Sequence, residues 1–314
     1  MSRRHRPTPR VLTTLTALMT VGVLLAGCGS DGDDDTSSAS DGGCATENTS
    51  DRDKVNLIPI PPVKVTVTGF GNGERRVPAA TPDRDSAQQA TVVTTSSVAS
   101  AGSAQAQTVD LPLTARFHCT DPTDLEMDLG TVTSPDPTLN DQLAPAAGGH
   151  AGMAIAPGLV PISLRLMPTD SSGPEARLAI EQAMIGAFTR SVPLPTVPIA
   201  VGATWRAERV ISAAATVTQT IEAKLTAWEG NRLTVTYTVD ESPINSVFAI
   251  PGGNQTLTIA RYSFTGNGTE TVDLTRGLPV DGAATYRGAR ELVGADASQR
   301  LLQQTGFTLT WRSR

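Results

Sequence analysis

The chain has few of the residues on which enzymes and metal sites most often depend. Its 314 residues include three histidines and three cysteines, and no two cysteines have the Cys-x-x-Cys spacing of zinc and redox sites. The sequence also contains no Gly-x-Ser-x-Gly elbow, no His-Glu-x-x-His motif and no Walker loop. We therefore predict no catalytic residue, no metal ion and no cofactor. A glycosidase-type acid pair stays open as an alternative, since any two of the 31 acidic residues could meet in space.

Positive charge is also scarce. The sequence contains three lysines, Lys54, Lys64 and Lys224, and 25 Lys plus Arg stand against 31 acidic residues. If residues 1–27 are removed as a signal peptide, the chain loses four arginines and no acidic residue, which leaves a net charge of −10. An acidic domain binds nucleic acid poorly and is repelled by anionic lipid head groups. We predict no nucleic-acid partner.

Long apolar runs are absent except near the N-terminus. The 16 residues from Val11 to Ala26 follow a segment with four arginines, and a bilayer-spanning helix needs about 20 apolar residues. A basic start, a short apolar middle and small residues at the end are typical of a secretory signal peptide, here residues 1–27. Arg3-Arg4 raises twin-arginine export as an alternative to general secretion, although His5-Arg6-Pro7 matches that signal poorly.

The end of this run, Leu25-Ala26-Gly27-Cys28, resembles the lipobox of bacterial lipoproteins. The resemblance implies that the Cys28 thiol is diacylated, with fatty acids such as palmitate, and that Cys28 becomes the new N-terminus. Each buried acyl CH₂ contributes about 0.8 kcal/mol, so two or three chains anchor a protein firmly. We expect a protein on the extracytoplasmic side of the cell membrane, with the membrane as its partner. An ordinary signal peptide or a membrane-spanning anchor is the alternative.

Two cysteines remain, Cys44 and Cys119. An even number of cysteines in an exported chain predicts a disulfide. It would close a loop of about 75 residues and contribute roughly 4 kcal/mol in the chain-entropy model. Two free thiols are the alternative. A Cys-His site at His118-Cys119 is less favoured, because adjacent strand residues point to opposite faces.

The rest of the chain predicts a mainly β (α+β) protein made of curved antiparallel sheet. Residues 28–54 are polar and acidic, which is typical of a disordered tether. An N-terminal β half (55–134) and a C-terminal β half with a helix (159–314) then flank a linker or flap (135–158) that is rich in Pro, Gly and Ala. Similar Gly-Asn-Gly segments near residues 70 and 266 suggest two related halves, although turn chemistry alone explains the similarity. His150, in the linker, is interpreted as a solvated loop histidine.

Alternating apolar residues predict the strands. The turn at 229–232 predicts a hairpin between strands 216–228 and 233–239, whereas residues 99–107 predict a long turn and Gly266-Asn267-Gly268 another turn. The remaining predicted strands cover 63–68, 91–98, 109–119, 125–129, 160–167, 256–266, 269–274, 283–293 and 307–311.

One principal helix is predicted over 174–189, with a serine as its N-terminal cap and Pro174 in its first turn. Its apolar arc is wide, because Leu178 and Ile185 lie well around the cylinder from Met184 and Phe188. The helix therefore either lies in the concave face of a curved sheet or caps an ordinary sandwich. In the first case, Leu178, Met184, Ile185 and Phe188 are the candidate residues for lining an apolar ligand site.

The proline-rich segment that follows, 193–205, cannot form a helix or a central strand. Its pattern from Pro198 to Trp205, P-x-x-V-G-x-T-W, resembles one in an uncharacterised family of β-rich envelope and secreted lipoproteins of high-GC Gram-positive bacteria. The resemblance covers roughly residues 55–314 and brings no catalytic residues with it. We expect Trp205 to be a buried anchor.

These observations favour a binding or structural module at the cell surface, with an envelope protein as one kind of partner. The leading specific alternative is a carrier of lipid or another apolar ligand in a half-barrel cavity, and an envelope hydrolase is the least favoured. An apolar cavity of several hundred Å³ would favour the carrier. A close-packed interior would favour the structural module.

The lipobox resemblance predicts the effect of Cys28→Ala. The variant should incorporate no labelled palmitate and should leave the membrane fraction, because the thiol that carries the acyl chains is gone. Incorporation and fractionation can be compared with the parent chain in the same cells. Unchanged processing and unchanged membrane retention would contradict the predicted anchor.

Overall fold

The computed structural model describes residues 43–51, 53, 55–250, 255–296 and 300–313. The predicted signal peptide, Cys28 and the first part of the predicted tether lie outside these residues. No helix within them has both the length and the apolar composition that crossing a membrane would need.

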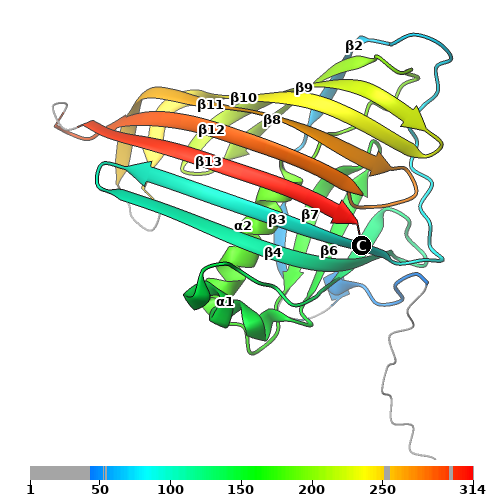
Figure 1. Ribbon diagram of the computed structural model, residues 1–314, viewed down its shortest axis with the longest axis horizontal. Helices are drawn as coiled ribbons and strands as arrows, with labels where there is room; N and C mark the ends of the chain where they lie inside the picture. The colour runs from blue at the N-terminus through cyan, green and yellow to red at the C-terminus, as the bar shows by residue number, and fades with distance from the viewer. Residues whose placement is uncertain (1–42, 52, 54, 251–254, 297–299, 314) are drawn as a thin grey trace, which may run out of the picture. The chain divides into compact units, whose positions relative to one another are not determined.

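The described residues form one open antiparallel sheet of 13 strands (Figure 1). This confirms the predicted mainly β class with a curved antiparallel sheet. The strands are β1 Asn56–Pro59, β2 Lys64–Gly69, β3 Gln88–Ser100, β4 Ser103–Phe117, β5 Asp124–Leu129, β6 His150–Ala156, β7 Val160–Met167, β8 Thr204–Ser212, β9 Ala215–Glu229, β10 Arg232–Ala249, β11 Thr256–Asp273, β12 Asp281–Val293 and β13 Arg300–Ser313. Their order in the sheet is β1-β7-β6-β5-β4-β3-β13-β12-β11-β10-β9-β8-β2.

Two meanders make up this sheet. Strands β3 to β7 follow one another in chain order, as do β8 to β13, and the pairing of β13 with β3 joins the two meanders. The first two strands cross between them, since β1 pairs with β7 and β2 pairs with β8. Only residues 60–63 connect β1 to β2, so the two sheet edges approach within roughly 18 Å there, given the reach of an extended chain.

The predicted linker over 135–158 is wrong, and so is the end of the N-terminal half at 134. Helix α1 (Pro137–Leu143) and strand β6 occupy this stretch, and the N-terminal meander continues to Met167. The Asp136 side chain caps α1 by accepting hydrogen bonds from two backbone N–H groups. Ala151, Met153 and Ile155 are buried on alternate positions of β6. The prolines and glycines mark the helix start and a turn rather than a linker.

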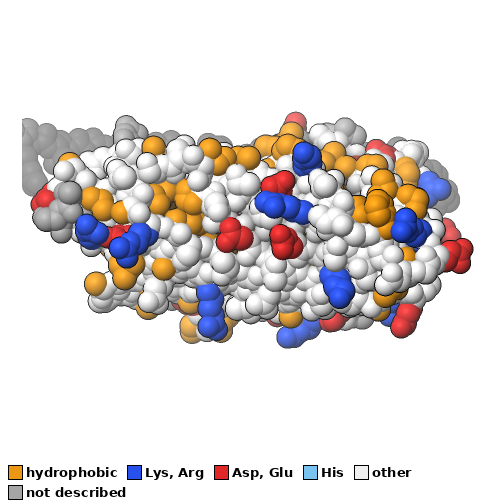
Figure 2. All heavy atoms as spheres, turned by 90° about the horizontal axis from the view of Figure 1, so that it is seen from above, with side chains coloured by type: hydrophobic (Ala, Val, Ile, Leu, Met, Phe, Trp, Pro, Cys, Tyr) orange, Lys and Arg blue, Asp and Glu red, His pale blue; other side chains and the backbone are white. Residues whose placement is uncertain are grey.

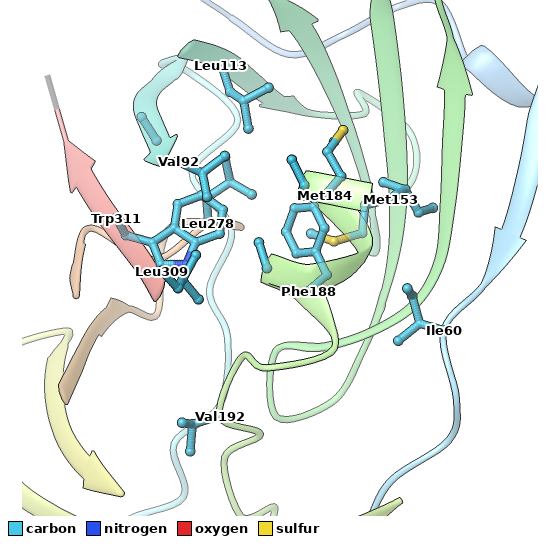
Figure 3. Close-up of a cluster of buried hydrophobic side chains, with 14 of the residues drawn as sticks. Ile60, Val92, Leu113, Met153, Met184, Phe188, Val192, Leu278, Leu309 and Trp311 are labelled. Carbon is cyan, nitrogen blue, oxygen red and sulfur yellow. The ribbon is translucent and has the colours of Figure 1, made fainter. Parts of the chain in front are cut away.

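Helix α2 (Pro174–Phe188) confirms the predicted helix and lies against the concave face of the sheet (Figure 1). Its N-terminal cap is Gly173 without a side-chain hydrogen bond, not the predicted serine. Phe188 packs against Trp311 with ring centroids 5.8 Å apart, and Met184 is fully buried nearby (Figure 3). Burial of a side chain of this size contributes about 1.5–3 kcal/mol, so α2 holds the two meanders around one core.

Two predicted turns differ in the structure. Residues 99–107 form a tight hairpin instead of a long turn, because Gly102 adopts a φ of 82° between β3 and β4. Strand β11 continues through the predicted turn at 266–268. Its glycines leave space for aromatic rings, since a Cβ on Gly266 would lie 2.3 Å from a carbon of the Tyr286 ring and one on Gly268 would lie 2.7 Å from Tyr237.

The proline-rich segment runs extended before β8, and Trp205 is a buried anchor as predicted, with 1% of its surface exposed. The Trp205 Nε1–H group donates a 2.9 Å hydrogen bond to the carbonyl oxygen of Pro193. The hairpin predicted around the turn at 229–232 is also confirmed, with Glu229 and Arg232 paired at its end.

The N-terminal segment is ordered from residue 43, so the predicted disordered tether does not extend to 54. The predicted disulfide between Cys44 and Cys119 is present, with Cα atoms 4.9 Å apart. The short helix η1 (Thr49–Asp51) follows, and it lies against strands β6 and β7, where Thr49 is buried. The polar, acidic composition of residues 28–54 gave no indication of these contacts.

A buried ion network fixes this segment. Arg165 on β7 contacts the carboxylates of both Asp124 and Glu126 on β5, the latter at 2.9 Å, and donates a 2.8 Å hydrogen bond to the Thr49 hydroxyl. All four residues are at least nine-tenths buried. Burial raises the pKa of the Glu126 carboxyl, against the hydrogen bonds from Thr49.

Arg165→Met should reduce the free energy of unfolding by about 3–5 kcal/mol, because it leaves two buried carboxylates without their cation. Urea unfolding at pH 7 with the disulfide intact would measure the loss. Arg206→Met is the matched control, since Arg206 pairs with Glu208 at an exposed site, where an ion pair contributes at most about 1 kcal/mol. Equal losses in the two variants would contradict a special role for the network.

Candidate functional site

The inner face of the sheet is left open beside the second half of α2. We call this space, of about 390 Å³, the distal hollow. Ser96, Gln182 and Ala213 are exposed there, so it opens to solvent. The lining residues are Thr94, Ser96, Gln107, Gln182, Ala183, Ile185, Gly186, Thr189, Arg190, Ile211, Ala213, Ala214, Ala215, Val217, Glu241, Tyr262, Arg290 and Phe307. Its volume is within the range of small-molecule sites.

A row of polar side chains crosses the inner face at the base of the distal hollow. Arg209 on β8, Gln219 on β9 and Glu241 on β10 are register partners across three strands. Gln219 Nε2 donates a 3.1 Å hydrogen bond to Glu241 Oε1, and the Tyr262 hydroxyl donates one of 3.1 Å to Glu241 Oε2. We use the name polar belt for Arg190, Arg209, Gln219, Glu241 and Tyr262.

Arg190 reaches the belt from the end of α2. Its guanidinium lies 4.4 Å from the ring centroid of Phe307 and 5.2 Å from that of Tyr286, within cation–π range. Its Nη2 is 3.9 Å from Glu241 Oε1, a loose ion pair. Gly186 leaves room for the Phe307 ring on which Arg190 packs, because a Cβ at position 186 would lie 2.9 Å from that ring. The charge of Arg190 is therefore held at the wall of the distal hollow.

Several belt atoms are buried without a hydrogen-bond partner in the described structure. They are Nε of Arg190, Nε and Nη1 of Arg209, and Oε1 of Gln219. Arg209 is 3% exposed, and its Nη2 makes only a long 3.4 Å contact to the carbonyl oxygen of Ser191. Burial, followed by the nearby charge of Arg190, lowers the pKa of Arg209 to about 10, which keeps it a cation at neutral pH.

Glu270 lies on the same inner face but toward the close-packed side, 2% exposed. Burial raises the pKa of its carboxyl to about 8, although the backbone N–H of Val192 donates to it. It is therefore mostly protonated at pH 7 and does not balance the arginines. The neighbouring hydroxyls of Tyr237 and Tyr286 are 3.4 Å apart, and burial raises the pKa of both, for Tyr286 to about 12.

The structure separates the four residues predicted to line a ligand site. Ile185 lines the distal hollow. Met184 and Phe188 are fully packed in the core, and Leu178 is 54% exposed and does not line the hollow. The wide apolar arc of α2 is explained by burial against the sheet at Met184 and Phe188, and by the hollow at Ile185.

The polar belt was not predicted from the sequence. A signal for it exists, because Arg209 occupies the inward position after Trp205 and Ala207, and Gln219 interrupts an inward series of Val217 and Ile221. A charged or polar residue on the apolar face of a strand is the pattern that indicates such a site.

His150, predicted to be a solvated loop histidine, instead begins β6 and pairs with Asp128. Its Nδ1 is 2.9 Å from Asp128 Oδ1, and Arg116 lies 3.0 Å from the other carboxylate oxygen. The hydrogen bond from His150 lowers the pKa of Asp128. A pocket of about 210 Å³ adjoins His150, but none of its described lining residues carries a hydroxyl or thiol.

The outer surface carries a depression of about 690 Å³ over β3, β4, β12 and β13. Thr95, Ser97, Thr285 and Arg287 line part of it, and no unpartnered buried polar atom belongs to its outward-facing residues in the described chain. Figure 2 shows a face on which uncharged polar side chains and backbone predominate and charges of both signs are interspersed.

No set of three or more His, Cys, Asp and Glu side chains in the described parts of the chain is arranged to hold a metal ion. A scan against protein-family models finds no match, and a search of the curated proteins finds none either.

Glu270→Gln should change how stability depends on pH. Because the folded-state pKa is raised above the unfolded value of 4.5 to about 8, the carboxyl favours folding less as pH rises through this window, by several kcal/mol in total. The amide group of the variant has the same shape as the carboxyl group of Glu270 but cannot ionise. The variant should therefore be more stable than the parent at pH 8 and should lose little stability between pH 5 and pH 8.

Urea midpoints at pH 5, 6, 7 and 8 would check this expectation. Glu222→Gln is the control, since Glu222 is exposed on the outer face of β9. If Glu270→Gln follows the pH profile of the parent chain, the carboxyl does not titrate as described.

Proposed function

We propose that this protein is an extracytoplasmic binding protein, held at the membrane through Cys28, that takes an amphiphilic ligand into the distal hollow. The observation that carries the proposal is the contrast along α2. The inner face is close-packed at Met184 and Phe188, whereas beside Ile185 a hollow of about 390 Å³ is left open.

The walls of the distal hollow support an amphiphile rather than a wholly apolar or wholly polar ligand. Ile185, Ile211, Val217 and Phe307 supply apolar surface, and the polar belt supplies charge and hydrogen-bonding groups at one end. Ligand sites commonly combine an apolar lining with a few placed polar groups in this way.

Apolar side chains also stay uncovered further along the same inner face. Val98 and Leu301 are 39% and 40% exposed, and both face inward, since Leu301 is the register partner of the buried Leu292. Uncovered apolar surface that adjoins a hollow is typical of a binding face. An acyl chain would remove it from water.

A structural or interaction module that contacts another envelope protein is the second candidate. The close-packed core around Phe188 and Trp311 (Figure 3) favours it, because a packed interior needs no ligand. The two candidates differ in whether the distal hollow has an occupant.

Ile185→Trp should abolish ligand binding while Leu178→Trp leaves it unchanged. The indole at position 185 would project into the distal hollow and obstruct it beside α2, whereas position 178 is on the same helix and exposed. Binding of N-phenyl-1-naphthylamine, an uncharged fluorescent probe, should weaken at least tenfold in the first variant. Both tryptophan variants would be made in the mature chain with Cys28→Ala, secreted behind an ordinary leader.

Native mass spectrometry of the same protein would show whether an amphiphile co-purifies. The absence of probe binding to the parent, together with a ligand-free mass, would favour the structural module. Equal loss of binding in both tryptophan variants would mean that the probe binds elsewhere.

A further inference from the structure

The charges that face the distal hollow do not balance. Arg190 and Arg290 line it, and Arg209 lies one inward position from Ile211 on β8, directly behind the wall. Glu241 is the one carboxylate among the lining residues of the described chain. Three guanidinium groups against one carboxylate leave two positive charges in excess.

Arg209 is the least compensated of these groups. The charge that acts on it most is that of another cation, Arg190, and two of its three guanidinium nitrogens are buried without a partner in the described structure. An unpaired buried charge costs several kcal/mol, and the fold does not require one at this position, because the neighbouring inward residues on β8 are the apolar Ala207 and Ile211. The missing component is an anion.

We propose that the ligand of the distal hollow carries an acidic head group, a carboxylate or phosphate, which Arg190 contacts directly and which the charge of Arg209 attracts from behind. This inference rests on the proposed function and specifies its ligand class. The rings of Phe307 and Tyr286 hold the Arg190 guanidinium at the wall. Gln182 and Arg290 offer further donors around the head group.

The geometry also sets the orientation of the ligand. The polar belt lies at one end of the distal hollow, and the exposed inward residues Val98 and Leu301 lie toward the β3–β4 and β12–β13 hairpins. The head group therefore lies at the belt and the acyl chain points toward these hairpins. A fixed head-group position distinguishes specific binding from mere adsorption of a hydrocarbon.

Decanoate and 1-decanol test the proposal, because they share a chain and differ in the acidic group. Displacement of N-phenyl-1-naphthylamine from the mature Cys28→Ala chain should show decanoate binding at least tenfold more tightly at pH 7.5. Arg190→Gln should remove this preference, because it should weaken the binding of decanoate far more than the binding of 1-decanol. Arg287→Gln, which removes the same charge from the exposed outer face of β12, should keep the preference.

Arg209→Met supplies a readout that a purely structural arginine would not give. If Arg209 is kept for the ligand, the ligand-free variant should unfold at a higher temperature than the parent and should bind decanoate at least tenfold more weakly. A lower unfolding temperature would show that Arg209 supports the fold, and would overturn its assigned role.

The remaining outcomes separate this inference from the proposed function. Equal affinities for decanoate and 1-decanol in the parent would overturn the acidic head group and leave the hollow as a site for uncharged amphiphiles. Failure of both ligands and of the uncharged probe to bind would overturn the proposed function itself. If inorganic phosphate alone binds as tightly as decanoate, the hollow takes a free anion and the amphiphile is wrong.

Discussion

Helix α2 is too short to cover the face on which it lies, and the distal hollow follows from this mismatch. Its 15 residues span roughly 22 Å at 1.5 Å per residue. Strands β10 and β11 have 18 residues each and extend for roughly 60 Å at about 3.3 Å per residue. Where α2 is present, Met184 and Phe188 fill the concavity. Beside its second half, where Gln182, Ile185 and Gly186 line the distal hollow, the described chain leaves the inner face of the sheet partly uncovered.

The polar belt lies at the transition between these two zones. Arg190 lies two residues past the end of α2. The row from Arg209 to Glu241 crosses the sheet beneath it. Such groups reduce the stability of a fold when they lack partners. If the proposed ligand binds beside them, these groups are a place where the fold gives up stability for binding.

The sequence predicted those features that depend on local periodicity. The helix at 174–188, the hairpin around Gly230, the anchor Trp205 and the pair Cys44–Cys119 all follow from alternation, turn residues or counting. The glycines at 266 and 268 misled the prediction, because glycine marks a turn as readily as it marks a place where Tyr286 and Tyr237 need room. His150 and Asp128 are 22 residues apart, and their contact depends on the pairing of β5 with β6. The inward position of Arg209 was readable, but its lack of a partner was not, since partners come from the assembled sheet.

The crossing of the first two strands between the sheet edges has a consequence for the order of assembly. Strand β1 completes the N-terminal meander, but β2 must wait for β8, whose residues are about 140 positions later in the chain. Contacts this distant in sequence are slow to form. Strand β2 therefore stays without its final partner until β8 has been added to the chain. The pairing that must form last is that of β13 with β3, in which Ser313 is the register partner of Ala90, so the sheet is completed only when the C-terminal strand has arrived.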